Sequence, residues 1–325
     1  MNVGFTYDLK DDYLLEGYSK DQVAEFDSKV TIDAVCAAIE GMGHKVDRIG
    51  HAFALSKLLI KGQRWDLVFN ICEGMYGSGR ESLVPALLDA GRIPYVFSGP
   101  LVHAITLNKA VTKKLLSHSG LPVTDFMLAA DAADIKKPKW KWPYFVKAVA
   151  EGTGKSVTPA SKVFNMTELR TQAQALIEEF KQPVIIEPFL PGREVTVGVL
   201  GSGADAFSIG VMEVAFTDKA DSDIHSYYNK ENCETAAIYT LAEDDFAARC
   251  AEIAVEAYRA LDIKDACRVD IRADGRGRPQ IMEINSLPGL MPGRSDLILL
   301  AELAGLSYEY VIETIVNSAV KRWAL

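Results

Sequence analysis

Residues 267–289 read CRVDIRADGRGRPQIMEINSLPG, and we expect this stretch to decide the fold. Polar and apolar residues alternate over 268–272 and again over 281–285, a period of two that predicts β-strands. The turn-rich segment DGRGRP between them predicts a β-hairpin. Residues two apart share one face of a strand, so a polar face and a core face are expected. These are Arg268, Asp270, Glu283 and Asn285 on the polar face, and Val269, Ile271, Met282 and Ile284 on the core face.

The polar face of this hairpin favours a metal site. Two carboxylates held close together repel each other unless a cation neutralises them. An oxygen-only set of carboxylates and a carboxamide suits Mg²⁺, completed by water and substrate phosphates. A surface hairpin with solvated charges would show the same alternation. The second strand, however, runs directly into the loop SLPG at 286–289, and sites tend to be built on such loops. We therefore favour a metal–nucleotide site.

The composition excludes several classes of protein. A chain of 325 residues can form two or three domains, and its net charge of −9 disfavours a nucleic-acid partner. The five cysteines are scattered without a C-x-x-C pair, which favours a reducing compartment over a zinc site or a disulfide framework. The N-terminus has no signal-peptide pattern, and no apolar run approaches the length of a membrane span. We expect a cytoplasmic protein that binds neither nucleic acid nor membrane.

The first hundred residues alternate between strand and helix patterns. Strands are expected at 2–7, 44–49, 66–71 and 93–97, with helices at 28–43 and 81–90. This alternation predicts a parallel α/β unit, in which ligands bind at the carboxyl ends of strands. The glycine-rich loop 72–81 follows such a strand and is a candidate substrate loop, although a flexible connector would have the same composition.

The rest of the chain is predicted as mixed strands and helices. Helices are expected at 104–119, 165–180, 243–261, 296–304 and 308–321, and further strands at 126–130, 144–149, 184–190, 195–200 and 208–216. The polar, turn-rich segment 218–234 predicts a mobile flap.

Residues 150–156, AEGTGKS, are not a P-loop, because Val149 stands where that motif needs glycine and Pro159 prevents a helix from following at once. A glycine-rich loop can still bind phosphate through its backbone N–H groups.

Eight polar residues make the chain resemble the ATP-grasp superfamily and, within it, the D-alanine–D-alanine ligases. In order they are Lys113, Lys147, Glu187, Glu194, Arg268, Asp270, Glu283 and Asn285. The match covers nearly the whole chain and is strongest at 147–154, at IIEPFLPGREVTVGVLG (185–201) and at RVD…MEINSLPG. The resemblance implies an α/β (α+β) ATP-grasp fold of three domains, with the nucleotide held between the last two. These are an N-terminal substrate domain at 1–104, a central lid domain at 105–188 and a C-terminal catalytic domain at 189–325.

The resemblance also implies roles for individual residues. ATP would bind with two Mg²⁺ ions, or with Mn²⁺ in their place, and the metal ligands would be Asp270, Glu283 and Asn285. The cofactor-binding residues would be Lys113, Lys147, Glu151, Gly152, Thr153, Glu187, Phe189, Leu190, Glu194 and Lys230. The catalytic group would be Arg268, Glu25, Thr153 and Ser295, with Arg268 stabilising an oxyanion through its rigid, always-charged fork of donors.

The implied reaction joins two small amino acids. A carboxylate attacks the γ-phosphate of ATP to give an acyl phosphate, and an amine then displaces phosphate to form a peptide bond. The resemblance implies D-alanyl-D-alanine for peptidoglycan precursor synthesis in the cell wall pathway, and a homodimer. Two alternatives stay open: a ligase that joins other amino acids or amines, and a non-catalytic ATP-binding regulatory protein.

The substrate-binding elements depart from the family pattern. Glu25 lies in a longer loop than the family's glutamate that holds the ammonium of the first substrate. The loop at Glu73-Gly74 begins with His-Gly in the family, and Lys230 lacks the tyrosine that usually follows it. Ser295 lies one residue further past Gly289 than expected. The identity of the substrates is therefore the least determined part of the prediction.

Overall fold

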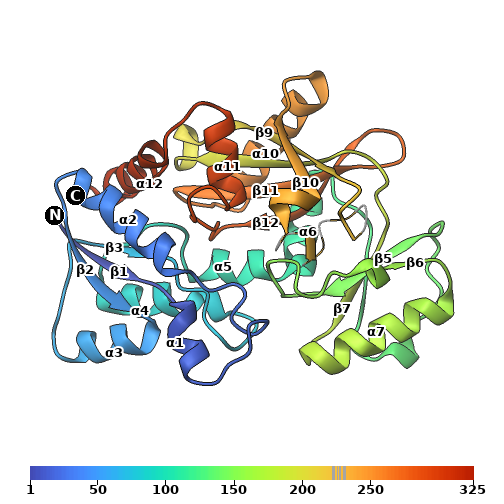
Figure 1. The fold of residues 1–325 in the computed structure, drawn as a ribbon, viewed down its shortest axis with the longest axis horizontal. Coiled ribbons are helices and arrows are strands. Elements are labelled where there is room, and N and C mark those ends of the chain that lie inside the picture. Colours follow the sequence, from blue (N-terminus) through green and yellow to red (C-terminus); the bar gives the residue numbers. More distant parts are fainter. Residues whose placement is uncertain (222–223, 225, 227, 230–231) are drawn as a thin grey trace.

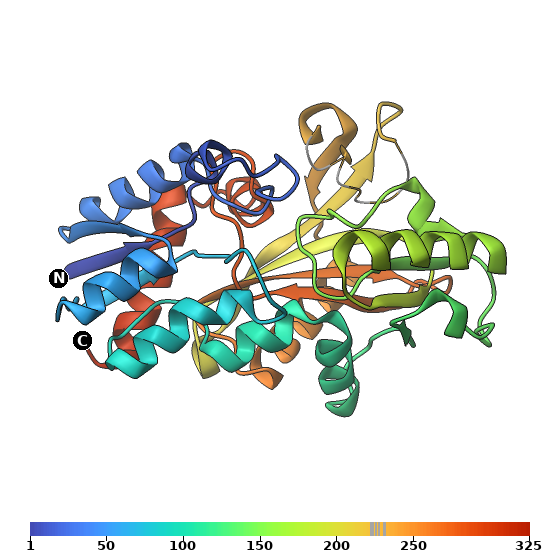
Figure 2. The ribbon, with the colours of Figure 1, turned by 90° about the horizontal axis from the view of Figure 1, so that it is seen from below.

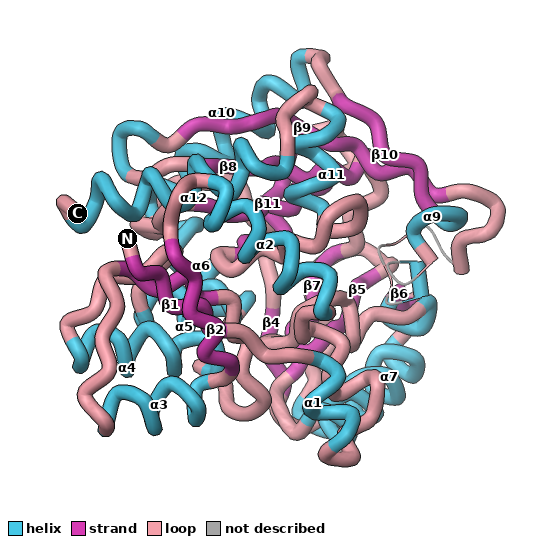
Figure 3. Tube along the Cα trace, turned by 60° about the vertical axis from the view of Figure 1, so that its left-hand side comes forward, coloured by secondary structure: helices cyan, strands magenta, loops and turns pink. Residues whose placement is uncertain are grey.

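The computed structural model describes residues 1–325 except 222–223, 225, 227 and 230–231. Three β-sheets succeed one another along its long axis (Figure 1). A three-stranded sheet lies at one end, a four-stranded sheet lies at the other, and a five-stranded sheet extends between them (Figure 2). Both chain termini lie beside the three-stranded sheet (Figure 3). In the described part of the chain, no helix combines the length and apolar character needed to cross a bilayer.

The N-terminal sheet is parallel, as predicted. Its order is β2-β1-β3, with β1 at Asn2–Thr6, β2 at Lys45–Gly50 and β3 at Leu67–Asn70. The predicted helices are present as α2 (Lys29–Gly41) and α4 (Leu83–Gly91), and α2 is capped by Ser28, whose hydroxyl accepts a hydrogen bond from the Thr31 N–H. Two helices were not predicted, α1 (Lys10–Leu15) and α3 (Ala52–Ile60). The strand expected at 93–97 is only an isolated bridge between Val68 and Tyr95.

The basic helix predicted at 104–119 is two helices. They are α5 (Pro100–Leu107) and α6 (Lys109–His118), and the chain breaks between them at Asn108. Asn108 has extended backbone dihedrals, and its side chain accepts a hydrogen bond from the Val111 N–H. An asparagine in this position is a strong N-cap. The break places Lys109 in the first turn of α6.

The four-stranded sheet has the order β4-β7-β5-β6 and is antiparallel. Its strands are β4 (Met127–Ala129), β5 (Tyr144–Ala148), β6 (Lys162–Val163) and β7 (Val184–Pro188). Helix α7 (Met166–Phe180) covers one face and buries Leu169, Ala173 and Leu176 against it. The opposite face remains open towards the five-stranded sheet and supplies one wall of the site.

The five-stranded sheet has the order β10-β9-β8-β11-β12 and is antiparallel throughout. Its strands are β8 (Glu194–Leu200), β9 (Phe207–Phe216), β10 (Ala237–Leu241), β11 (Ala266–Ala273) and β12 (Pro279–Asn285). Strand β10 and the short helix α9 (Cys233–Ala236) before it were not predicted. The flap prediction at 218–234 lies partly outside the described residues.

Three helices bury the faces of this sheet. Helix α10 (Asp245–Ala260) packs Cys250, Ile253 and Ala257 against the alternate valines of β8. Helices α11 (Asp296–Leu303) and α12 (Tyr308–Trp323) share a second core with β1 and α2. The C-terminal helices therefore tie the five-stranded sheet to the N-terminal sheet.

The hairpin β11–β12 forms as predicted, but with a bulge. Asp270 pairs with Glu283 and Ile271 pairs with Ile281, so Met282 is an extra residue on β12. A bulge shifts the alternation of side chains on its strand. Met282, expected in the core, is consequently half-buried and lines the cleft beside Glu283, and that expectation was wrong.

Candidate active site

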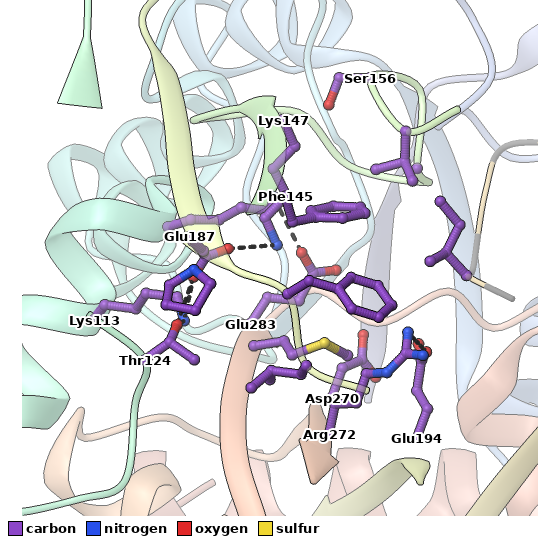
Figure 4. A pocket seen from close by; sticks show the side chains of 18 of the residues that line it. Lys113, Thr124, Phe145, Lys147, Ser156, Glu187, Glu194, Asp270, Arg272 and Glu283 are labelled. Atoms are coloured by element: carbon purple, nitrogen blue, oxygen red, sulfur yellow. Dashed lines mark hydrogen bonds and ion pairs between the residues drawn. The ribbon is translucent and has the colours of Figure 1, made fainter. Parts of the chain in front are cut away.

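A deep cleft lies between the four-stranded and five-stranded sheets. Its walls come from α6, β5, β7, β8, β11, β12 and the glycine-rich loop 150–156. Figure 4 shows the side chains of these elements pointing into one space. The cleft brings together nine of the predicted site residues, Lys113, Lys147, Glu151, Glu187, Phe189, Leu190, Glu194, Asp270 and Glu283. Lys230 lies outside the described residues.

Glu187 is the centre of a buried charge network in this cleft (Figure 4). The Lys113 ammonium lies 2.7 Å from one of its oxygens, which also accepts a hydrogen bond from Thr124 at 2.9 Å. Lys147 contacts the other oxygen at 3.5 Å. Burial alone would raise the pKa of Glu187, but the two lysines outweigh it and lower the pKa to about 2. The cleft therefore holds two positive charges around one carboxylate.

The two predicted lysines, Lys113 and Lys147, differ in how many protein groups already accept hydrogen bonds from them. Besides Glu187, the Lys113 ammonium donates to Thr124 at 3.0 Å and to the Ile281 carbonyl at 3.1 Å, so its three donors have protein acceptors. Burial lowers the pKa of Lys113, whereas Glu187 and Glu283 overcome burial and raise the pKa of Lys147. Lys147 is thus the better placed of the two to meet an added anion.

Lys109 is a site residue that the sequence analysis missed. Its ammonium donates to the Glu151 carbonyl at 2.6 Å and lies 3.2 Å from a Glu283 oxygen. It therefore links the glycine-rich loop to the acidic hairpin. The signal was present in Asn108, because an N-cap there places Lys109 in the first turn of a new helix rather than on the solvated face of a long one.

Asp270 and Glu283 form the acidic end of the cleft. Arg268 holds both Asp270 oxygens, at 3.0 and 2.9 Å, and Thr196 donates to one of them at 2.9 Å. The Arg268 guanidinium also lies 3.9 Å from Glu283. Arg268 on one side and Lys109 on the other compensate the paired carboxylates, as a bound cation would.

The donor set fits Mg²⁺ only when Asn285 or a phosphate joins it. Within residues 1–221 and the other described positions, no three His, Cys, Asp or Glu side chains are grouped as metal ligands. Asn285 lies two residues beyond Glu283 on β12, and its side-chain oxygen accepts one hydrogen bond, from the Leu287 N–H at 3.2 Å. A carboxamide oxygen has two lone pairs, so one remains available. Carboxylate and amide oxygens completed by phosphate are the ligands that Mg²⁺ prefers.

The far end of the cleft is aromatic and cationic. Lys162 and Arg272 lie 4.0 Å and 5.1 Å from the Phe189 ring centroid, within range of cation–π interaction. Arg272 also forms an ion pair with Glu194 at 2.9 Å. Arg272 was missed, although the period of two on β11 places it on the same face as Arg268 and Asp270. A flat aromatic ligand would find a stacking partner here.

A second cavity of about 330 Å³ adjoins the hairpin. Five predicted residues line it, Glu25, Thr153, Arg268, Asn285 and Ser295. Its volume is at the small end of the range for ligand pockets, about 300–1,000 Å³. Small molecules of amino-acid size therefore suit it better than long peptides.

Arg268 connects the two spaces. It binds Asp270 at the end of the cleft, lines the second cavity, and donates to Asp296 at 2.8 Å. Three of its five N–H donors are thus occupied and two remain. Ser295 accepts a hydrogen bond from the Met291 N–H at 2.9 Å, so its hydroxyl proton is free to donate into the cavity.

Glu25 is held in a cluster that fastens the glycine-rich loop to the segments that follow β1 and β3. The Gly152 N–H donates to it at 2.8 Å, Arg80 donates at 2.9 Å, and Lys155 lies at 3.6 Å. Burial would raise the pKa of Glu25, but Arg80 and Lys155 prevail and lower it. Thr153, with a φ of 53°, then turns the loop so that Thr153 lines the second cavity while Gly154 and Ser156 line the cleft.

Two sheets that close on a lysine-rich cleft ending in paired carboxylates define an ATP-grasp protein. A sequence model described as D-ala D-ala ligase C-terminus matches residues 115–317. The chain belongs to the D-alanine–D-alanine ligase family.

Named relatives agree with this assignment. The D-alanine–D-alanine ligase of Nocardia farcinica is 33% identical over 267 residues, which is 79% of this chain and 70% of that protein. The D-alanine–D-alanine ligase of Actinobacillus pleuropneumoniae is 31% identical over 291 residues, covering 87% of this chain and 90% of that protein. The crystal structure of Bacillus anthracis D-alanine–D-alanine ligase complexed with ATP superimposes with a TM-score of 0.74 at 20% identity, covering 100% of this chain and 99% of that one. This likeness confirms the predicted ATP-grasp fold.

Proposed function

We propose that this protein is an ATP-dependent ligase that joins D-alanine to D-alanine through an acyl phosphate. The observation that carries the proposal is the position of Arg268, which binds Asp270 at the end of the cleft and also lines the second cavity. The terminal phosphate of a nucleotide in the cleft and the carboxylate of an acid in the second cavity would meet at this arginine. The names of the relatives supply the substrate, D-alanine.

The cleft offers a complementary place for each part of ATP. The adenine would stack near Phe189 and Leu190, and the ribose hydroxyls would bind Glu194. The phosphates would lie towards Lys147, Lys109 and the N–H groups of the glycine-rich loop, where cations and backbone donors face the same space. The family resemblance implied Lys113 for this role, but its donors are occupied by Glu187, Thr124 and Ile281. We therefore assign Lys113 to holding Glu187 in place.

The acidic hairpin would hold the metal. Asp270, Glu283 and Asn285 would supply ligands for two Mg²⁺ ions, or for Mn²⁺. When bound, the ions would neutralise the β- and γ-phosphates. The protein's own residues position the reactants and compensate charge, which is most of what phosphoryl transfer requires.

The reaction would proceed in two steps. The carboxylate oxygen of the first D-alanine forms a bond to the γ-phosphorus as the bond to the β-phosphate oxygen breaks, giving an acyl phosphate and ADP. The ammonium of the second D-alanine loses one proton to solvent, the resulting amine attacks the acyl carbon, and a second proton is lost from its nitrogen as the C–O bond breaks and inorganic phosphate leaves. The two free donors of Arg268 would bind the oxyanion that develops between attack and departure.

Water must be excluded while the acyl phosphate exists, because hydrolysis would waste it. The Glu25 cluster would keep the glycine-rich loop closed over the reacting centre. Ser295, at the far wall of the second cavity, would donate its hydroxyl proton to the carboxylate of the second D-alanine.

The test is product formation by the purified protein. With ATP, Mg²⁺ and D-alanine, we expect phosphate release and a dipeptide of the mass of D-alanyl-D-alanine. A scan of single and paired amino acids in the same assay decides between D-alanine and other substrates. ATP binding without phosphate release from any amino acid would refute the ligase and favour a regulatory protein.

The proposal extends to the compartment, oligomeric state and binding partners of the enzyme. We propose a cytoplasmic homodimer that acts on small-molecule amino acids, supplies peptidoglycan precursor and binds no nucleic acid. The net charge of −9 supports the last point. Light scattering coupled to size-exclusion chromatography would determine the oligomeric state.

A further inference from the structure

An amino acid that offers its carboxylate for activation carries an ammonium group into the same cavity. Burying an ammonium without a partner is costly, so the cavity needs a carboxylate whose charge is not already used. Identifying that carboxylate rests on the proposed function, since it assumes that the acid substrate is an amino acid.

Glu25 is a poor choice for this partner. Its two oxygens are held by the Gly152 N–H at 2.8 Å and by Arg80 at 2.9 Å, and Lys155 adds a second cation at 3.6 Å. Its negative charge is therefore matched within the protein. If the Glu25 carboxylate turned to a substrate, it would break the hydrogen bond that holds the glycine-rich loop.

Asp27 also lines the second cavity, but it has a partner of its own. Its side chain forms a hydrogen bond with Thr31, and the charge of Lys10 offsets part of its own. Burial nevertheless raises the pKa of Asp27 to about 7, so Asp27 is the alternative that the binding test must separate from Glu73. Asp296, on the opposite wall, is paired with Arg268 at 2.8 Å. The remaining carboxylate on the wall of the cavity is Glu73.

Glu73 has no hydrogen bond or ion pair with any residue that the structure describes. Loss of solvent raises its pKa well above the ordinary value, and the nearby carboxylates of Glu81 and Glu25 raise it further, which together outweigh the opposing charge of Arg80. A cation arriving beside Glu73 would relieve both effects. At the wall formed by the 72–81 loop, the cavity thus contains an acidic side chain that makes no ion pair with any described residue and whose charge Arg80 offsets only in part.

The backbone beside Glu73 is fixed. The Gly74 N–H donates to Asp8 at 2.9 Å, and the φ of Gly74 is +71°. A Cβ at this glycine would lie 2.8 Å from the Arg80 carbonyl, so the loop is packed closely upon itself. A carboxylate on such a support is positioned before the ligand arrives, which reduces the ordering cost of binding.

We propose that Glu73 binds the ammonium group of the acid substrate, and that Glu25 instead fastens the glycine-rich loop. Glu73 would then determine that the activated acid is an α-amino acid rather than a simple carboxylic acid. The family's histidine at this position cannot do so in the same way, because a neutral imidazole carries no negative charge.

The test is equilibrium binding, which requires no turnover. Calorimetry on the full chain saturated with ADP and Mg²⁺ compares D-alanine with propionate, which has the same carboxylate and methyl group but no ammonium. We expect the wild-type protein to prefer D-alanine by about tenfold or more, the size of a charge-assisted contact. Glu73→Gln should abolish this preference and leave propionate and ADP affinities unchanged, and Glu73→Asp should restore part of it.

Matched variants decide the assignment. Glu25→Gln and Asp27→Asn should retain the preference for D-alanine, although Glu25→Gln should weaken nucleotide binding. The assignment is overturned if the wild-type protein does not distinguish the two ligands, if Glu73→Gln still prefers D-alanine, or if Glu25→Gln or Asp27→Asn removes the preference. Failure of the proposed function is a separate result, the absence of phosphate release by the wild-type protein with any amino acid.

Discussion

Asp270 and Glu283 are directly opposite each other on the antiparallel strands β11 and β12, with the bulge at Met282 immediately beyond them. Pairing two carboxylates across neighbouring strands costs stability unless cations compensate them. Lys109 at 3.2 Å from Glu283 and Arg268 at 2.9 Å from Asp270 provide this compensation. The end of the cleft therefore holds two adjacent carboxylates, which could bind the metal of a metal–nucleotide complex.

Neutralising either carboxylate should remove activity without unfolding the protein. We expect Asp270→Asn and Glu283→Gln to lower kcat at least about 100-fold, because charge neutralisation by bound metal is worth several kcal/mol. Glu252→Gln, on the exposed face of α10, is the control. Phosphate release measures the effect and circular dichroism checks the fold. Wild-type turnover in either variant would disprove the metal assignment.

Lys109 should matter for ATP and its neighbour Lys114 should not. Lys109 is buried at the cleft, whereas Lys114 is exposed on the same helix. Lys109→Met should raise the KM for ATP by about 10- to 100-fold, the loss of one charge-assisted contact. Lys114→Met should leave it unchanged. Equal KM values in the two variants would exclude Lys109 from phosphate binding.

Removing the charge of Glu187 should destabilise the whole protein. Glu187→Gln leaves Lys113 and Lys147 buried without their shared anion, which typically costs about 3–5 kcal/mol. Asp33→Asn, which breaks the exposed pair with Arg48, is the control and should change the free energy of unfolding little. Urea unfolding at pH 7 measures both. A loss no larger than that of the control would show that the network does not contribute to stability.

The same carboxylate gives a pH dependence with a defined sign. Its pKa is lowered from 4.5 to about 2 in the folded state, so its stabilising contribution is fully present above pH 4.5 and is lost as the pH falls towards 2. The contribution is about 3 kcal/mol. In urea titrations between these pH values, the difference between wild type and Glu187→Gln should shrink as the pH falls. A constant difference would contradict the assignment.

The glycine-rich loop should tolerate no side chain at Gly152. A Cβ there would lie 2.7 Å from a Glu25 oxygen, so Glu25 would have to leave Arg80 or the loop would have to move. We expect Gly152→Ala to lower kcat/KM for ATP by about 10- to 100-fold, since small misplacements of positioning groups have effects of this size. Gly275→Ala is the control, because the nearest atom to its Cβ lies 3.8 Å away. Equal effects of the two substitutions would show that the contact with Glu25 is unimportant.

Most of the secondary structure followed from pattern, and the errors have physical causes. The helix predicted at 104–119 missed the break at Asn108 because apolar spacing continues across it and only the capping residue marks the change. Strand β10 pairs with β9 by backbone hydrogen bonds that a short exposed segment does not signal. Residues 93–97 have the composition of a strand but form a single bridge, since their extended chain does not stay beside β3.

The sequence predicted the individual motifs of the candidate site but not which side chains contact one another across it. The hairpin, its chemical groups and the glycine-rich loop could be read from the chain. Lys109 and Arg272 were missed because their importance depends on which way a helix or strand faces across the cleft. The assignment of Glu25 to the substrate ammonium stays an untested prediction, and the structure favours Glu73 as its replacement.

The sequence by itself determined which side chains share each face of β11 and β12, because covalent geometry fixes a period of two along any strand. It also determined the family, because ordered polar motifs survive along the chain. Only the tertiary structure decided which charges are already matched. Glu25 meets Arg80 from 55 residues away and Gly152 from 127 residues away, whereas Glu73 in the same region meets neither. Such pairings depend on how separate sheets and loops pack together. Local sequence patterns cannot predict them, because the paired residues lie far apart in the chain.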